Sequence, residues 1–401
     1  MDDKIEFEIK NIKSILEKYY GDRRLGLHEP QFCQEDINAV SECVRSTFVS
    51  SVGGSLTKFE KELTQLTGRS VCSVVNGTAA LYLALSALCL PKGSLVIVPT
   101  ISFVATVSIL KQLDLVPYLV DVSEVSLHLD FNSFETKLYE EFDEHDDGRL
   151  FHKGSGKLLS AVVSVDAFGQ VADLTSWRSF CDSASTALIS DSAAALGAKS
   201  ELGHANSLAD VSIFSFNGNK IMSTGGGGMI VSDNSEHLKR AKHLTTTAKR
   251  DALTYFHDEV GYNYRLVNVL AALGVAQLEQ LDSFIASKID TASYYRDNLK
   301  GVGDIGFQLV HDGVTSNEWL FTITTSSMHE LLDYLNANGV MSRPFWIPMN
   351  QLPMYKNNLY VNHSDVSARI HGSALSIPCS TNILKSDLEK VVVTIKMFFD
   401  R

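Results

Sequence analysis

Between residues 71 and 232, short apolar runs alternate with stretches of helical periodicity, and this alternation limits the possible folds more than any other feature. Alternating strands and helices are typical of a wound α/β sheet. In such sheets ligands bind beyond the carboxyl ends of the strands, so the residues after each run are candidate site residues. The predicted strands are 71–75, 95–98, 116–121, 158–165, 187–191, 211–216 and 229–232, separated by helical stretches such as 79–88 and 103–112.

Helical patterns dominate the rest of the chain, which we divide into an N-terminal helix and arm (1–30), a large domain (31–285) and a small α+β domain (286–401). Periodic apolar residues predict an amphipathic helix in the first 20 residues. Capping-box spacing predicts helix starts at Ser327 and Ser386, the first of these helices ending at Gly339. The other predicted helices are 31–48, 56–68, 273–284 and 288–299.

The charge and cysteine content exclude several classes of protein. A net charge of −12 leaves no basic stripe for a nucleic-acid backbone. The six cysteines lack C-x-x-C spacing and lie mostly in apolar runs, as reduced core thiols do. No signal peptide and no membrane-spanning run is recognisable. We therefore expect a cytoplasmic protein that binds neither nucleic acid nor membrane, and we predict no metal site.

The first predicted strand leads into Asn76-Gly-Thr-Ala-Ala80, which opens a helix. Gly77 permits a close backbone approach, Thr78 offers a hydroxyl, and the free amides of a first helical turn attract anions. The segment therefore has the outline of a phosphate cradle, although an ordinary capped helix gives the same pattern. It matches neither a Walker P-loop nor a Gly-x-Gly-x-x-Gly fingerprint.

Two further strands are followed or ended by candidate binding residues. Phe103, after the second strand, can stack on a planar ring, although a core role is the ordinary alternative. Asp191 ends the fifth strand among small residues, where a carboxylate needs a partner such as a protonated pyridine nitrogen. A helix N-cap is the alternative for Asp191.

Lys220 lies on a tight connection between the sixth and seventh strands, just before four consecutive glycines. A lysine held beside packed apolar chain loses its proton readily, and a neutral amine forms a Schiff base with an aldehyde. A structural or exposed lysine is the alternative when the residue is taken alone. With the phosphate cradle, Phe103 and Asp191, however, Lys220 completes the set of groups that pyridoxal 5′-phosphate requires.

The chain also resembles the DegT/DnrJ/EryC1/StrS sugar-nucleotide aminotransferases over nearly its whole length. This resemblance implies the aspartate-aminotransferase fold (fold type I), a mixed, mostly parallel sheet flanked by helices with a smaller α+β domain. It also implies a homodimer with shared sites. The matching segments are NGTAAL (76–81), SFVAT (102–106), VDAFG (165–169), DSAAALG (191–197), SFNGNK (215–220), GYNYR (261–265) and AALGVAQ (271–277).

The same resemblance implies a role for each cofactor residue. Lys220 would bind the cofactor aldehyde and act in catalysis, Asp191 would meet the pyridine nitrogen, and Phe103 would lie beside the ring. The implied phosphate ligands are Gly77, Thr78, Ser215 and Asn263, the last from the other subunit.

Other segments resemble the branch that serves legionaminic acid and bacillosamine synthesis: LHEP (27–30), TFVSSVG (47–53), FNGNKI (216–221), TTTAK (245–249) and VMSRP (340–344). This branch implies transfer of an amino group from L-glutamate to a UDP-linked 4-keto-6-deoxy-N-acetylhexosamine. In the segment Arg343-Pro-Phe-Trp346, the arginine can bind an anion through two hydrogen bonds and lies close to aromatic residues in the sequence. An ordinary surface arginine is an equal alternative. The candidate substrate residues are His28, Glu29, Arg265, Arg343 and Trp346.

One position departs from the family pattern. Ala194 stands three residues after Asp191, where the family usually has Gln, His or Glu, and alanine cannot hydrogen-bond through its side chain. A non-catalytic sugar-nucleotide-binding or regulatory module is therefore one alternative to an aminotransferase. A sugar dehydratase of the same fold is another, but those relatives carry histidine in place of the lysine.

Overall fold

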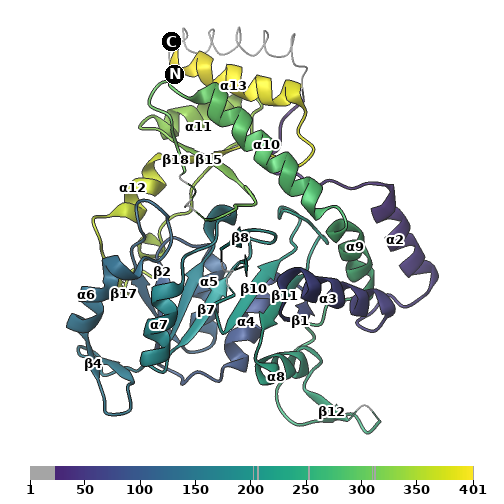
Figure 1. Cartoon of the computed structure of the whole chain (residues 1–401), viewed down its shortest axis with the longest axis vertical. Helices are drawn as coiled ribbons and strands as arrows, with labels where there is room; N and C mark the ends of the chain where they lie inside the picture. The colour runs from purple at the N-terminus through teal and green to yellow at the C-terminus, as the bar shows by residue number, and fades with distance from the viewer. Residues whose placement is uncertain are drawn as a thin grey trace.

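The computed structural model describes residues 23–400 apart from 202, 206, 252, 309, 311 and 312, so the helix expected in the first 20 residues lies outside the described part. An eight-stranded sheet forms its centre, in the order β1-β11-β10-β7-β6-β2-β3-β17 (Figure 1). These strands are β1 (Ser70–Val74), β2 (Leu95–Pro99), β3 (Val116–Val120), β6 (Leu159–Val165), β7 (Ala187–Asp191), β10 (Val211–Ser215), β11 (Gly228–Ser232) and β17 (Leu359–Val361).

The central sheet is mixed and mostly parallel, as predicted. Strands β10, β7, β6, β2, β3 and β17 run parallel to one another, whereas β11 lies antiparallel between β1 and β10. All seven predicted strands are present within one residue at each end. The eighth strand, β17, was not predicted; it comes from the C-terminal part of the chain and pairs with β3.

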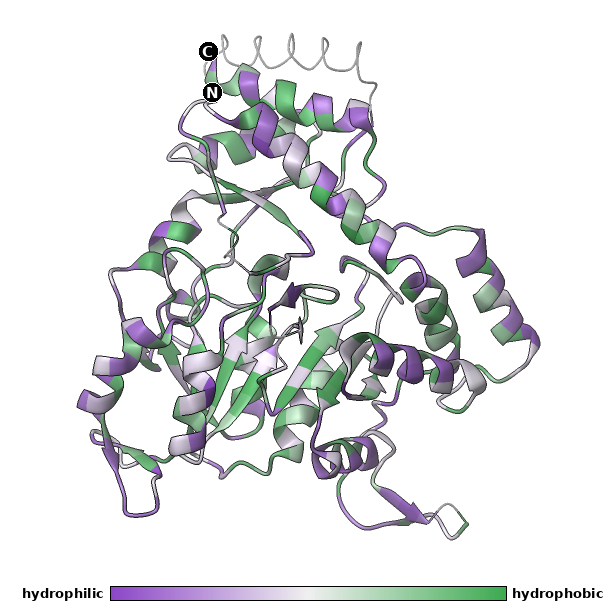
Figure 2. Cartoon of the chain, in the orientation of Figure 1, coloured by the Kyte–Doolittle hydropathy of each residue, from purple (hydrophilic) through white to green (hydrophobic). Residues whose placement is uncertain are grey.

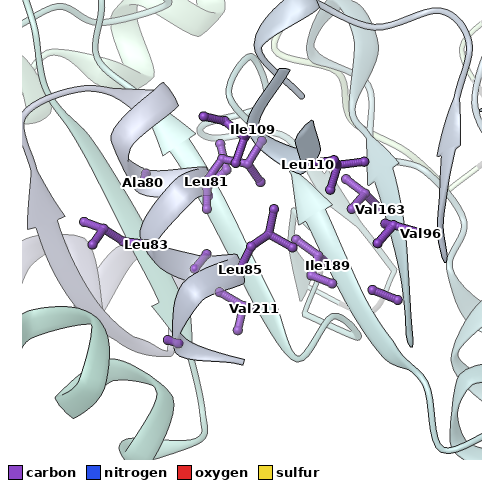
Figure 3. Packing of buried hydrophobic residues seen from close by; sticks show 14 of the residues in the cluster. Ala80, Leu81, Leu83, Leu85, Val96, Ile109, Leu110, Val163, Ile189 and Val211 are labelled. Carbon is purple, nitrogen blue, oxygen red and sulfur yellow. The ribbon is translucent and has the colours of Figure 1, made fainter. Parts of the chain in front are cut away.

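Helices cover both faces of the sheet because its strands bury side chains on both sides. On β2, Val96 and Val98 pack with α4 (Gly77–Ala87), α5 (Val104–Gln112) and α8 (Ser235–Thr245), as Figure 3 shows in part. The alternate residues Leu95 and Ile97 pack on the other face with α6 (Phe131–Glu141) and α7 (Thr175–Ser183). This two-residue period is the expected property of a buried strand.

A third apolar cluster extends the core around β10 and β11. Phe214 and Phe216 pack with α3 (Gly54–Thr67) and α9 (Asn268–Leu278), and α2 (Gln34–Arg45) lies against α9. The short elements are β4 (Phe142–Glu144), β5 (Leu150–His152), η1 (Ala167–Gly169), β8 (Lys199–Ser200), β9 (Gly203–His204), β12 (Lys249–Asp251), β13 (Phe256–His257) and η2 (Met349–Gln351).

The C-terminal part has its own α+β core. Its sheet contains β14 (Gly306–Phe307), β15 (Phe321–Thr324), β18 (Ala374–Ile377) and β16 (Arg343–Pro344), in that order. The helices there are α10 (Leu281–Leu299), α11 (Met328–Ala337), α12 (Val366–Ser373) and α13 (Lys385–Phe399), whose hydrophobic and hydrophilic residues alternate in Figure 2. Leu25 joins this core from the N-terminal segment. Helix α10 runs through residue 285 unbroken, and the predicted domain boundaries stay a prediction.

Several predicted helix limits were wrong; the helix predicted over 31–48, for example, spans only Gln34–Arg45. The helix predicted over 273–284 is interrupted, because α9 ends at Leu278 and α10 begins at Leu281. The N-cap of helix α13 is Leu384, two residues before the predicted cap Ser386, since Asp387, not Glu389, accepts the cap N–H. Helix α11 follows Ser327 as predicted but ends at Ala337, and the Ser327 side chain makes no capping bond. Among the described helices, none alone is long and apolar enough to cross a membrane. Taken together, the bent pair α9 and α10 is long and apolar enough, by length and composition only.

Candidate active site

Three of the predicted site segments meet at the carboxyl edge of the central sheet. Asp191 is the last residue of β7, Ser215 is the last residue of β10, and Gly77 follows β1 at the start of α4. The strand register aligns these ends: Val74 and Ser215 both pair with Gly228. The sheet therefore gathers residues that are far apart in the sequence.

Gly77 and Ser215 form the closest approach in this group. A Cβ on Gly77 would lie 2.8 Å from the Ser215 Cβ, and a Cβ on Gly228 would lie 2.8 Å from the Gly77 nitrogen. Asn76 caps α4 by accepting the Ala79 N–H at 2.8 Å. The N–H groups of the first helical turn have no helical acceptor, and this turn begins at Gly77, beside Ser215, and contains the exposed Thr78. This cradle suits a phosphate group.

Asp191 is buried and already holds two hydrogen bonds. Its carboxylate accepts the Thr106 hydroxyl at 2.7 Å and the Ala193 N–H at 3.2 Å. Burial raises the pKa of Asp191, and these two donors together with Lys220 act against that increase. A carboxylate has capacity for more than two donors, so Asp191 retains sites for a further positively charged partner.

Lys220 lies in the turn after β10, where its N–H donates to the Asn217 carbonyl at 2.9 Å. Burial lowers the pKa of the Lys220 amine to about 8, and the Asp191 carboxylate acts in the opposite direction. An amine with such a pKa exchanges its proton near neutral pH, which a nucleophile or an acid–base catalyst requires.

Trp319 and Asn317 belong to the same site but were not identified in the sequence. The Trp319 ring centroid lies 3.7 Å from the Lys220 amine, and its indole N–H donates to the Asn219 carbonyl at 2.5 Å. The buried Asn317 amide donates to the carbonyls of Ala194 and Leu196. One signal was available, because tryptophan is rare here, with three in the chain.

The predicted stacking residue Phe103 is exposed and lies near other aromatic rings. Its ring centroid is 6.4 Å from that of Trp346, which in turn stacks on Phe168 at 5.9 Å with planes 7° apart. Phe103 precedes α5, and the same helix carries Thr106, the donor to Asp191. Two of the predicted residues, Phe103 and Trp346, are thus brought together.

His28 is buried with both ring nitrogens unpartnered within the described part of the chain. Burial holds the pKa of His28 well below its usual value, and Lys288 and Lys220 act in the same direction. The ring is therefore a neutral group beside Lys220. The neighbouring Glu29 is oriented differently: its N–H donates to the Ser380 hydroxyl and its carboxylate pairs with Arg23 near the surface.

The remaining candidates fall into two groups. Arg343 and Asn263 are exposed, and the Arg343 guanidinium donates to the Ser342 carbonyl. Arg265, by contrast, is buried: its two terminal nitrogens lie 2.6 and 2.8 Å from the Glu60 carboxylate, and one also donates to the Ser73 carbonyl. These bonds give Arg265 a structural role and leave little donor capacity for a substrate.

Known proteins resemble this chain over most of its length. A family model described as the DegT/DnrJ/EryC1/StrS aminotransferase family matches residues 30–396. The GDP-perosamine synthase of Vibrio cholerae is 31% identical over 380 residues, which cover 93% of this chain and 99% of that protein. The UDP-4-amino-4,6-dideoxy-N-acetyl-beta-L-altrosamine transaminase of Campylobacter jejuni is 26% identical over 370 residues, covering 90% and 94%. The crystal structure of the aminotransferase TlmJ from Streptoalloteichus hindustanus matches with a TM-score of 0.84 and 23% identity, covering 93% and 98%.

Proposed function

The chain belongs to the DegT/DnrJ/EryC1/StrS aminotransferase family, and from that membership we propose that it transfers the amino group of L-glutamate to C4 of UDP-4-keto-6-deoxy-N-acetylhexosamine. It is a pyridoxal-phosphate-dependent sugar aminotransferase of amino-sugar biosynthesis. The sugar nucleotide and the donor are the proposed parts, together with a homodimer that shares its active sites and a role in bacterial glycan synthesis.

The residues at the carboxyl edge of the sheet fit pyridoxal phosphate. Gly77, Thr78 and Ser215 would hold the phosphate, since the cradle has free amides and no Cβ in its base. Asp191 would hold the protonated pyridine nitrogen, and Phe103 would cover one ring face. Asn263 of a second subunit would add a phosphate contact, which its exposure permits.

Pyridoxal phosphate, when bound, supplies an aldehyde that takes up an amine and a ring that withdraws electrons. The chain supplies the proton transfers. Lys220 would accept a proton from the α-carbon of L-glutamate in the first half-reaction and would deliver a proton to C4 of the sugar in the second. Asp191 would keep a positive charge on the pyridine nitrogen, because a buried carboxylate favours the protonated ring.

A single observation carries the aminotransferase proposal: Asp191 ends β7 and Lys220 follows the neighbouring parallel strand β10, so a buried carboxylate and an amine lie at the same edge of the sheet. In the folded chain each of these two side chains also acts on the pKa of the other. His28 and Trp346, at the edges of this region, are proposed to contact the sugar or its nucleotide; Glu29 and Arg343 are proposed only as peripheral contacts. We do not propose Arg265 as a substrate contact, because its guanidinium already forms hydrogen bonds with the Glu60 carboxylate.

A second nucleotide is a candidate for the sugar-nucleotide substrate. The sequence segments of the legionaminic acid and bacillosamine branch favour UDP, but the 31% identity to a GDP-perosamine synthase favours a GDP-linked 4-keto-6-deoxy sugar. Incubation of the protein with L-glutamate and UDP-, GDP- or dTDP-linked 4-keto-6-deoxy sugars separates these candidates. We expect amino sugar and 2-oxoglutarate in equal amounts with the UDP compound.

Lys220→Ala is the matched control for this assay. It should abolish turnover, and borohydride should no longer fix the cofactor to the chain, as followed by mass spectrometry. Turnover with the GDP or dTDP sugar alone would overturn the substrate assignment. Full turnover by Lys220→Ala would overturn the catalytic role, and no bound cofactor in the wild-type chain would favour a binding module.

A further inference from the structure

Trp319 contacts two consecutive residues of the lysine loop. Its ring centroid lies 3.7 Å from the Lys220 amine, and its indole N–H donates to the Asn219 carbonyl at 2.5 Å. The tryptophan is buried, with 3% of its surface exposed. One side chain therefore fixes both the backbone before the lysine and the amine at its end.

We propose that Trp319 is a positioning residue that holds the free amine of Lys220 over its indole face whenever the lysine is not bound to the cofactor. This inference rests on the proposed role of Lys220. A lysine side chain has four rotatable bonds, so an amine released from a covalent bond would otherwise sample many positions. An aromatic face attracts an ammonium group and restricts this sampling.

The ring also acts on the protonation of Lys220. Burial disfavours the charged amine, whereas Asp191, at the end of β7, favours it. The Trp319 face favours the ammonium as well, so it acts in the same direction as Asp191. On the side of the N-terminal segment, His28 is neutral and adds no charge of its own. Loss of the aromatic face should therefore lower the pKa of Lys220.

The position of Trp319 depends on Asn317. The side-chain Oδ1 of Asn317 accepts the backbone N–H of Trp319 at 3.0 Å, and the side-chain amide N–H groups of Asn317 donate to the carbonyls of Ala194 and Leu196 in the loop after Asp191. The Asn317 N–H also donates to the carbonyl of Gly169, whose φ of 87° and lack of a Cβ leave room for the Asn317 side chain. The loop of Asp191 and the ring under Lys220 are thus joined through one asparagine.

The test measures Lys220 in the full-length chain freed of cofactor. Labelling by acetic anhydride from pH 6 to pH 10, quantified by mass spectrometry against the exposed Lys239, gives the pKa of the amine. Trp319→Leu should lower this pKa by about 0.5–1 unit, the size of a partly desolvated cation–π contact. Labelling at pH 7 should then rise about 2.5- to 5.5-fold, because the neutral fraction of an amine with a pKa of about 8 increases by that factor. Trp319→Phe retains an aromatic face and should change the pKa by less than about 0.3 unit.

Fluorinated tryptophan keeps the test decisive if Trp319→Leu fails to fold. Fluorine weakens the negative face of the ring with little change in shape, so incorporation of 5-fluoro- and then 5,7-difluorotryptophan should lower the Lys220 pKa in two steps. Trp177→Phe, which alters a buried indole elsewhere in the core, should leave the wild-type pKa unchanged. An unchanged Lys220 pKa in the folded leucine variant or in the difluoro protein would overturn the proposal. Because no substrate or cofactor is present, the result is independent of the sugar assignment and of turnover.

Discussion

The backbone of Gly77 lies against the side chain of Ser215, so that a Cβ at position 77 would stand 2.8 Å from the Ser215 Cβ. Gly77→Ala should therefore force the cradle apart. We expect a loss of about 1–3 kcal/mol in the free energy of unfolding and a roughly tenfold weaker affinity for pyridoxal phosphate. Urea unfolding of the cofactor-free chain and a cofactor titration measure the two effects.

Gly372→Ala is the matched control, because no atom lies within 4 Å of the added Cβ in helix α12. It should be neutral or stabilise by up to about 1 kcal/mol. Equal behaviour of the two alanine variants would contradict the tight contact between Gly77 and Ser215.

The buried pair of Arg265 and Glu60 predicts a stability effect. Within the described part of the chain, Arg265→Leu leaves the Glu60 carboxylate with only the Ser73 N–H as donor, so the free energy of unfolding should fall by about 3 kcal/mol. Combining it with Glu60→Gln should recover at least about 1 kcal/mol. Lys92→Leu, which breaks an exposed pair with Asp114, should cost less than about 1 kcal/mol. A double variant with normal stability but a raised KM for the sugar would instead assign Arg265 to substrate binding.

The buried His204 should lower the free energy of unfolding at acid pH. Its Nε2 accepts the Gly197 N–H at 3.0 Å, and burial lowers its pKa from 6.5 to about 4. The unfolded chain therefore binds a proton between these two pH values that the folded chain does not bind, so stability falls as the pH falls. The difference reaches up to about 3 kcal/mol by pH 4. His204→Gln keeps an acceptor but not the titration; wild type and variant with parallel pH profiles would contradict the assignment.

The buried Asp166 should give the free energy of unfolding the opposite dependence on pH. Burial raises the pKa of this carboxyl to about 7, above its usual 3.8, so the folded chain holds a proton that the unfolded chain releases between these values. The stabilisation is complete below pH 3.8 and is lost as the pH rises to about 7. Asp166→Asn should therefore gain about 1–3 kcal/mol relative to wild type on going from pH 5 to pH 8, in chemical unfolding at both values. A constant difference between the two proteins would disprove the raised pKa.

Local sequence patterns predict the central sheet well because burial on both faces makes its strands continuous apolar runs. Strand 187–191 is predicted to the residue, since Asp191 ends the run. Helix ends that depend on distant residues are predicted poorly. The break between α9 and α10 contains no glycine or proline; there, the Gln277 and Gln280 amides bind the carboxylate of Asp36, which comes from α2.

The candidate site shows the same division. Asp191 and Ser215 end strands, and Gly77 and Lys220 follow strands closely, so their meeting at one edge follows from the sheet. Trp319 comes from the segment before β15, and no local pattern connects it with Lys220. The guanidinium of Arg265 was expected to bind substrate because sequence alone does not reveal the buried Glu60 that pairs with it.

The antiparallel strand β11 has a consequence for the order in which the protein is made. Among the described strands of the central sheet, β1 pairs with β11 alone, and β11 begins at Gly228, 154 residues after Val74 (228 minus 74). At usual translation speeds these residues take on the order of 10–30 s to synthesise. During that interval the nascent chain holds Ser70–Val74 without its sheet neighbour. The segment around Gly77 therefore gains its full support only after the lysine loop and β11 have left the ribosome.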